Sequence, residues 1–274
     1  MKQKVWFITG ASRGFGRIWA EAALKRGDKV VATARKIETI KELEDKYGDL
    51  AFALELNVDD RDECFEAIKK AHEHFERLDV VINNAGYGQF GMIEELTEEE
   101  IRQQFETNVF GAVWITQAAL PILRKQQSGH ILQVSSIGGI LAFENIGIYN
   151  ASKFALEALS DALSKEVAGF GINITLIEPG GFDTDWSGSS AKRAKPIEAY
   201  DKIREARAKS RGAWKQGEPE ATAKAILKVV DADKPPLRMF LGEQPVEWAK
   251  QEYQKRIDNW EQWQPVSASA QGNK

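Results

Sequence analysis

One short stretch of the chain carries three side chains that together can move a proton on an alcohol or ketone oxygen. Ser136 follows residues 131–134, an apolar run whose length and β-branched content are typical of a buried strand. Tyr149 and Lys153 come after a glycine-rich loop, four residues apart, so a helix places them on one face. Because a lysine ammonium favours the phenolate, we expect the pKa of Tyr149 to lie below its usual value of about 10. Such a tyrosine exchanges a proton with a substrate oxygen near neutral pH, and Ser136 can hold that oxygen.

The Tyr-x-x-x-Lys spacing is a weak signal when it stands alone. The chain has five tyrosines, and chance places a lysine four residues after one of them with odds of about one half. The hypothesis therefore depends on the rest of the chain.

The N-terminal residues have the pattern of a nucleotide-binding turn. Residues 4–8 read as a buried strand, three glycines follow within seven residues, and an alanine-rich helical pattern runs to about Lys25. Glycines let the backbone approach a pyrophosphate, and the free N–H groups of a helix N-terminus favour its charge. An ordinary strand-to-helix turn is the alternative, but the context favours a cofactor loop. Its expected members are Gly10, Ser12, Arg13, Gly14, Phe15 and Gly16.

The end of the second expected strand, residues 30–34, indicates which nucleotide is bound. A carboxylate at this position would accept hydrogen bonds from the ribose hydroxyls of NAD. Here Ala34 is followed by Arg35 and Lys36, and two cations suit the 2′-phosphate of NADP. Arg13 is a further cation for the same phosphate. A solvated surface pair is the ordinary alternative for Arg35 and Lys36, and their place at a strand end is what favours NADP.

Strand and helix patterns alternate up to residue 180, and the strands are almost continuously apolar. This order predicts an α/β fold: a Rossmann-like, doubly wound parallel sheet between two helical layers, in a single domain over residues 1–266. Ligands bind at the carboxyl ends of such strands. The residues expected at those ends are Gly10, Arg35, Asn57, Asn84, Ser136 and Pro179.

The last third of the chain has a different composition. Residues 184–217 are rich in Ser, Lys and Arg and are expected to form a partly helical substrate-binding excursion over the strand ends. A helix over residues 246–263 carries Trp248, Trp260 and Trp263, which we expect to make packing or subunit contacts. Residues 267–274 are expected to be disordered.

An asparagine interrupts a long helical pattern that begins with a capping box at Thr97. Asn108, followed closely by Gly111, has poor helix propensity, which predicts a kink or a functional position. A buried structural amide is the alternative.

The composition of the chain argues against several other classes of function. The net charge of −4 argues against a nucleic-acid or membrane-surface partner. The single cysteine, Cys64, cannot form an internal disulfide, and the sequence shows neither a signal peptide nor a membrane-spanning run, so we expect a cytoplasmic protein. His72 and His74 lie two residues apart on an expected helix and face different directions, so no metal site is expected.

Together these motifs resemble the classical short-chain dehydrogenase/reductase family over about residues 1–184, and weakly to 242. The matching features are Thr9-Gly10-x-x-x-Gly14-x-Gly16, Asn83-Asn84-Ala85-Gly86, Asn108, Ser136 thirteen residues before Tyr149, Lys153, and Pro179-Gly180.

The resemblance implies a role for each matching residue. Tyr149 would be the general acid/base, and Ser136 would steady the substrate oxygen. Lys153 would lower the pKa of the tyrosine and bind the nicotinamide ribose, and Asn108 would support a water relay to Lys153. The other cofactor contacts that it implies are Asn57, Val58, Asn84, Ala85, Gly86, Pro179, Gly180, Phe182 and Thr184.

Two positions depart from the family pattern. Asn57 stands where the family usually has an aspartate next to Val58, although an amide can still donate and accept hydrogen bonds to adenine. Glu178 before Pro179 is also unusual, and the sequence offers no explanation for it.

The sequence thus predicts an NADP(H)-dependent ketoreductase that interconverts a ketone or aldehyde and an alcohol by hydride transfer. The resemblance implies a homodimer or homotetramer formed through the helices that bear Asn108 and Tyr149. The expected substrate walls contain no arginine or lysine, which favours a hydrophobic substrate. Those walls are Tyr87, residues 137–143, Gly181 and Trp186.

Two other functions were weighed against this prediction. A non-catalytic NADP(H)-binding sensor or scaffold is the main alternative, and the presence of both Tyr149 and Lys153 argues against it. Sugar-nucleotide epimerases usually belong to a larger branch with a different glycine motif, so we discount them.

Overall fold

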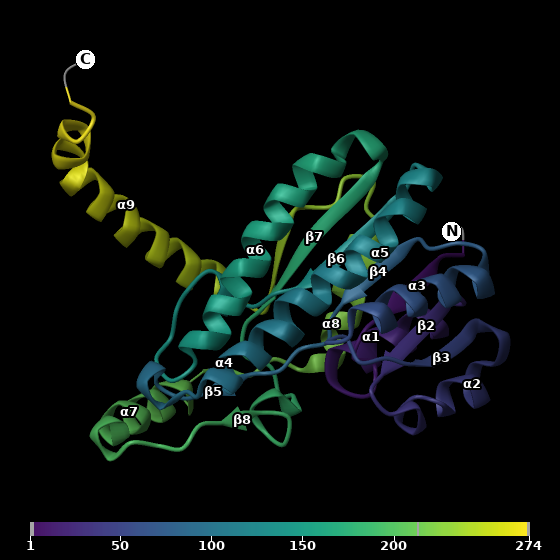
Figure 1. Cartoon of the computed structure of the whole chain (residues 1–274), viewed down its shortest axis with the longest axis horizontal. Coiled ribbons are helices and arrows are strands. Elements are labelled where there is room, and N and C mark those ends of the chain that lie inside the picture. The colour runs from purple at the N-terminus through teal and green to yellow at the C-terminus, as the bar shows by residue number, and fades with distance from the viewer. Residues whose placement is uncertain (1–2, 213, 273–274) are drawn as a thin grey trace.

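The computed structural model describes residues 3–212 and 214–272, and a seven-stranded parallel sheet forms its centre (Figure 1). The strand order is β3-β2-β1-β4-β6-β7-β9, so the chain reverses its direction across the sheet between β1 and β4. Ligands bind at such switch points in doubly wound sheets. The predicted Rossmann-like fold is confirmed. The strands are β1 (Val5–Ile8), β2 (Lys29–Ala34), β3 (Ala51–Glu55), β4 (Val80–Asn83), β6 (Gly129–Val134), β7 (Ile172–Pro179) and β9 (Arg238–Leu241).

Helices cover both faces of the sheet and bury two separate cores. One core joins the sheet to α1 (Gly14–Lys25), α2 (Glu42–Tyr47) and α8 (Thr222–Val230). The other joins it to α3 (Arg61–Phe75), α5 (Gly111–Gln126) and α6 (Gly147–Val167). All four residues of β1 are apolar because both faces of the strand are buried. Trp6 and Ile8 enter the first core, whereas Val5 and Phe7 enter the second.

The helix starts follow their capping residues. Asp60 caps α3 by accepting a hydrogen bond from the backbone N–H of Glu63 at 2.9 Å. Thr97 and Glu100 form the predicted capping box at α4 (Glu98–Phe105). Between α4 and α5 the chain forms a π-helix, Glu106–Phe110, which confirms the irregularity expected at Asn108.

The excursion expected over residues 184–217 lies at one end of the molecule, below the strand ends (Figure 1). Its strand β8 (Lys192–Arg193) pairs with β5 (Gln89–Phe90), and it continues into α7 (Asp201–Gly212). Pairing with β5 therefore anchors this segment beside the loop that follows β4.

The C-terminal helix α9 (Pro245–Ser269) projects away from the body of the protein (Figure 1). Near its start, Trp248 and Ala249 pack against the loop after β6, as expected for a packing tryptophan. Trp260 and Trp263 are instead 61% and 56% exposed. The helix also continues to Ser269, so residues 267–269, expected to be disordered, are helical; residues 273–274 lie outside the described residues.

Among the helices that the structure describes, none has the length and apolar content needed to cross a lipid bilayer.

Candidate active site

A cavity of about 720 Å³ opens at the carboxyl ends of the strands. Most of the site residues expected from the sequence line it. They are Gly10, Ser12, Arg13, Gly14, Phe15, Arg35, Asn57, Val58, Asn84, Ala85, Gly86, Ser136, Tyr149, Lys153, Pro179, Gly180, Phe182 and Thr184. Gly16 and Asn108 lie behind this wall and support it. The fold therefore brings residues from six loops to one place.

Tyr149 lies at the start of α6 and is 6% exposed. The centre of its ring is 4.9 Å from that of Trp186, which belongs to the residue 184–217 segment. Ser136 follows β6, and its Oγ accepts a hydrogen bond from the N–H of Gly138 at 3.0 Å. Burial raises the pKa of Tyr149 to about 12, although a hydrogen bond with the Ser136 hydroxyl opposes the rise.

The expectation that Lys153 would bring the pKa of Tyr149 below its usual value is therefore wrong for this structure. Lys153 Nζ donates a hydrogen bond to the carbonyl of Val134 at 2.8 Å and lies 5.8 Å from the centre of the Tyr149 ring. Burial lowers the pKa of Lys153 itself to about 8, and the negative charge of Glu157 opposes this decrease. Burial is the largest cause of the pKa shift of each group.

Asn108 is buried in the π-helix, and its side chain holds the loop after β4 and the start of α6. Its Nδ2 donates to the carbonyl of Tyr87 at 3.1 Å and to Ser152 Oγ at 3.2 Å, and its Oδ1 accepts from the N–H of Tyr87 at 3.1 Å. A Cβ on Gly86 would lie 3.0 Å from Asn108 Oδ1 and 3.7 Å from Lys153 Nζ. The absence of a side chain at Gly86 thus lets both the Asn108 amide and the Lys153 ammonium lie close to the backbone of the loop after β4.

Asn84 holds the glycine loop in place. Its Nδ2 donates to the carbonyls of Thr9 at 2.9 Å and Gly10 at 3.0 Å. A Cβ on Gly16 would lie 2.5 Å from both Asn84 Nδ2 and Gly10 O. The spacing of the glycines is therefore needed for the loop to pack against β4 and to expose its N–H groups.

The cations expected near a 2′-phosphate have different surroundings. Arg35 is exposed and lines the cavity, directly after the buried Ala34 at the end of β2. Lys36 is exposed but lies outside the wall of the cavity. Arg13 also lines the cavity, but its Nη1 lies 2.8 Å from Asp185 Oδ2. Arg13 thus joins the glycine loop to the segment that begins at Thr184.

The substrate end of the cavity differs from the sequence expectation. Tyr87, Gly181 and Trp186 line it as expected, but only Ile137, Gly138 and Phe143 of residues 137–143 do so. Ile140 and Leu141 instead pack into the small core that includes Ala249 of α9.

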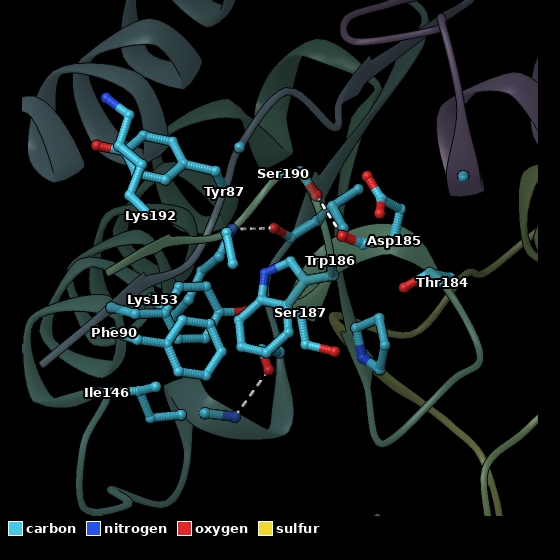
Figure 2. A pocket seen from close by; sticks show the side chains of 18 of the residues that line it. Tyr87, Phe90, Ile146, Lys153, Thr184, Asp185, Trp186, Ser187, Ser190 and Lys192 are labelled. Carbon is cyan, nitrogen blue, oxygen red and sulfur yellow. Dashed lines mark hydrogen bonds between the residues drawn. The ribbon is translucent and has the colours of Figure 1, made fainter. Parts of the chain in front are cut away.

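The expectation that no arginine or lysine stands in these walls is wrong. In addition to Arg13, Arg35 and Lys153, the cavity is lined by cations from the residue 184–217 segment, which are Lys192, Arg193, Arg204 and Arg207. Lys192 Nζ lies 4.7 Å from the ring centre of Tyr87, and the guanidinium of Arg193 lies 4.9 Å from that of Phe90. Figure 2 shows Lys192 beside Tyr87, and Trp186 beside Phe90. The Ser-, Lys- and Arg-rich composition of this segment is the feature of the sequence that could have indicated cations in the cavity. No local sequence pattern indicates that the segment packs on Tyr87 and Phe90.

Residues 4–195 match the model of the short chain dehydrogenase family. The chain belongs to this family. It is 42% identical over 271 residues to the oxidoreductase BOA17 of Botryotinia fuckeliana, covering 97% of this chain and 99% of that protein. It is 34% identical over 200 residues to the NADPH-dependent 3-dehydrocapnine reductase of Ornithobacterium rhinotracheale, covering 71% of each. A crystal structure of a short-chain dehydrogenase from Streptomyces avermitilis matches 98% of both chains, with a TM-score of 0.92 and 38% identity.

This short-chain dehydrogenase is accordingly an oxidoreductase that acts on alcohol and carbonyl groups with a nicotinamide cofactor. The glycine loop, the closely packed Gly16 and the cavity beside them fit a dinucleotide. No group of three or more His, Cys, Asp or Glu side chains within residues 3–212 and 214–272 is arranged to hold a metal ion.

Proposed function

We propose that this short-chain dehydrogenase is an NADP(H)-dependent reductase that interconverts a ketone or aldehyde and an alcohol, with Tyr149 as the proton donor and acceptor. The observation that carries the proposal is that Ser136, Tyr149 and Lys153 line the same cavity as the glycine loop. A bound nicotinamide would supply or accept the hydride. The chain's own residues would bind the substrate oxygen and move its proton.

Each side chain has a distinct part in this proton transfer. The Ser136 hydroxyl would hold the carbonyl oxygen, and the Tyr149 phenol would donate its proton to that oxygen. Because burial raises the pKa of Tyr149 to about 12, the residue is a phenol at neutral pH, which favours donation and hence reduction. The buried Lys153 ammonium would stabilise the phenolate that remains, and Asn108 would support a water relay to Lys153.

The preference for NADP(H) is inferred from the end of β2. Ala34 offers no carboxylate to ribose hydroxyls, and Arg35 stands next to it on the cavity wall. Arg13 pairs with Asp185, but the two side chains are 54% and 39% exposed. Such exposed pairs contribute about 1 kcal/mol or less, so a phosphate dianion can replace Asp185 as the partner of Arg13.

The walls near Tyr149 support an apolar substrate. Trp186 is in contact with the Tyr149 ring, and Phe90 lies 5.3 Å from Trp186 between ring centres. The additional cations come from the neighbouring excursion, where Lys192 and Arg193 are exposed. We infer that a hydrophobic ketone or aldehyde occupies the aromatic part of the cavity. We further infer that the protein works in the cytoplasm, where its single cysteine, the buried Cys64, stays reduced.

A direct test is to incubate the protein with NADPH and a panel of apolar ketones and aldehydes and to follow the loss of NADPH absorbance. We expect turnover with at least one member of the panel. Tight NADPH binding without turnover of any carbonyl or alcohol would support a sensor and contradict the proposal.

A further inference from the structure

Two glutamates are buried together behind the cavity, and the steps above use neither of them. Glu178 is the next-to-last residue of β7, before Pro179, and is 0% exposed; Glu157 lies one helical turn after Lys153 on α6 and is 5% exposed. As two carboxylates they would leave three of their four buried oxygen atoms without a hydrogen-bond partner among the described residues. These atoms are Glu157 Oε1, Glu178 Oε1 and Glu178 Oε2. Buried carboxylates without partners are strongly disfavoured.

Too little positive charge faces this pair to keep both glutamates ionised. In the described part of the chain, Arg238 of β9 places its Nε 3.0 Å from Glu157 Oε2 and 3.6 Å from Glu178 Oε1. The same guanidinium is shared with Asp161, at 3.1 Å, which also pairs with the exposed Lys165. The other cation nearby is the buried Lys153. Lys153 and Glu157 are four residues apart on α6 and so lie side by side on one helix face, and a single negative charge on the pair would therefore face both Lys153 and Arg238.

We propose that Glu157 and Glu178 share one proton at neutral pH, and that the one negative charge they keep holds Lys153 in its ammonium form. The Glu178 carboxyl O–H would donate to Glu157, because a proton turns one of two facing acceptors into a donor. The pair touches neither substrate nor cofactor in this scheme. It acts through Lys153, so it is a positioning pair, and its catalytic consequence rests on the proposed function.

The electrostatics of the cluster agree with this assignment. Burial raises the pKa of Glu178, and the neighbouring Glu157 carboxylate raises it further. Burial also raises the pKa of Glu157, but Ser135 and Arg238 oppose that rise, so the proton belongs on Glu178. The charge that supports Lys153 against its own burial is that of Glu157. The two glutamates should therefore differ in what their replacement does.

This difference gives a matched pair of variants. Glu178→Gln keeps a donor to Glu157 and the single negative charge, so it resembles the protonated residue. Glu157→Gln removes the charge next to Lys153. Glu166→Gln changes an exposed glutamate further along α6 and serves as the control.

The first experiment needs no enzyme activity: NMR titration of the protein with ¹³C-labelled glutamate carboxyls and labelled lysine side chains. Lys153 is assigned by the loss of its signal in Lys153→Met. We expect one glutamate that is still protonated at neutral pH in the wild type and absent in Glu178→Gln. The titration midpoint of Lys153 should fall by about one unit in Glu157→Gln and stay unchanged in Glu178→Gln and Glu166→Gln. Two ordinary acidic carboxyls, or an unchanged Lys153 midpoint in Glu157→Gln, would overturn the proposal.

The second experiment follows kcat/KM against pH. The basic limb of the profile should move to lower pH in Glu157→Gln, by the same shift as the Lys153 midpoint, and return in Glu157→Asp. An active Glu157→Gln enzyme with an unshifted limb would overturn the link to Lys153. If the NMR result holds but no carbonyl is turned over by the wild type, the proposed function fails and the proton-sharing pair stands. Thermal melting identifies any variant that does not fold, and Glu178→Gln then carries the test.

Discussion

Tyr149 shows how burial and chemistry compete at a single residue. The spacing of residues correctly predicted the neighbours of Tyr149, because Tyr149 and Lys153 share a helix face and Ser136 reaches the phenol. The direction of the pKa shift of Tyr149 could not be predicted in this way, because its burial depends on Trp186 and on strands from distant parts of the chain. A sequence pattern gives the partners of a titratable group, whereas its desolvation is a property of the folded structure.

The first prediction concerns the proton on Tyr149. Tyr149→Phe keeps the ring that contacts Trp186 and removes only the hydroxyl, so NADPH binding should persist. We expect kcat to fall by about 10²–10⁴-fold, the usual contribution of a general acid. Steady-state kinetics and NADPH fluorescence titration measure the two effects separately. A near-normal kcat in this variant would remove Tyr149 from the mechanism.

The second prediction concerns the choice of cofactor. Arg35→Asp replaces the guanidinium at the end of β2 by a carboxylate that repels a 2′-phosphate and accepts hydrogen bonds from ribose hydroxyls. One charge-assisted contact contributes about 1.5–3 kcal/mol, so the ratio of kcat/KM for NADPH over NADH should fall by tenfold or more. Lys36→Asp is the matched control, because Lys36 is exposed outside the cavity wall. Equal use of both cofactors by the wild type, or an unchanged ratio in Arg35→Asp, would contradict the prediction.

At the scale of elements, apolar runs and capping residues were informative because they act locally. The strand expected at residues 30–34 is observed as Lys29–Ala34, and the capping box at Thr97 lies where expected. The sequence did not predict that cations of the residue 184–217 segment line the cavity. Their position depends on the pairing of β8 with β5, which joins residues about one hundred positions apart in the chain. The sequence did not predict the partner of Glu178 either, because Arg238 lies sixty residues further along the chain.

The third prediction concerns the packing of the glycine loop on the sheet. In Gly16→Ala the new Cβ would lie 2.5 Å from both Asn84 Nδ2 and the carbonyl of Gly10, so the loop must shift. Overpacking of this kind costs about 1–3 kcal/mol, and the shifted loop should also bind NADPH more weakly. Gly169→Ala is the control, because nothing lies within 4 Å of its Cβ position. Urea denaturation and NADPH titration provide the two measurements. Equal stability and affinity for Gly16→Ala and Gly169→Ala would show that the close approach is not needed.

At the scale of the whole molecule, the layers and topology follow from the order of the elements, but the course of α9 does not. Its tryptophans suggested packing or subunit contacts; Trp248 packs on the body, whereas beyond it the helix projects outward with Trp260 and Trp263 exposed (Figure 1). Pro265 did not end the helix either, which continues to Ser269. Sequence patterns identify an apolar face but not the surface that covers it.

The last prediction is that the protein is a homodimer or homotetramer formed through the helices that bear Asn108 and Tyr149. Apolar side chains are exposed on both helical segments: Phe110, in the π-helix beside Asn108, is 40% exposed, and Leu159 on α6 is 45% exposed. A glutamate buried in an apolar interface is strongly disfavoured, so Leu159→Glu should shift the protein toward the monomer. Trp263→Glu tests α9 as the alternative interface, because Trp263 is 56% exposed and tryptophans of this helix are candidates for subunit contacts; we expect this variant not to dissociate. Light scattering at micromolar concentration measures both variants. A wild type that is monomeric, or a Trp263→Glu variant that dissociates while Leu159→Glu does not, would show that these helices are not the interface.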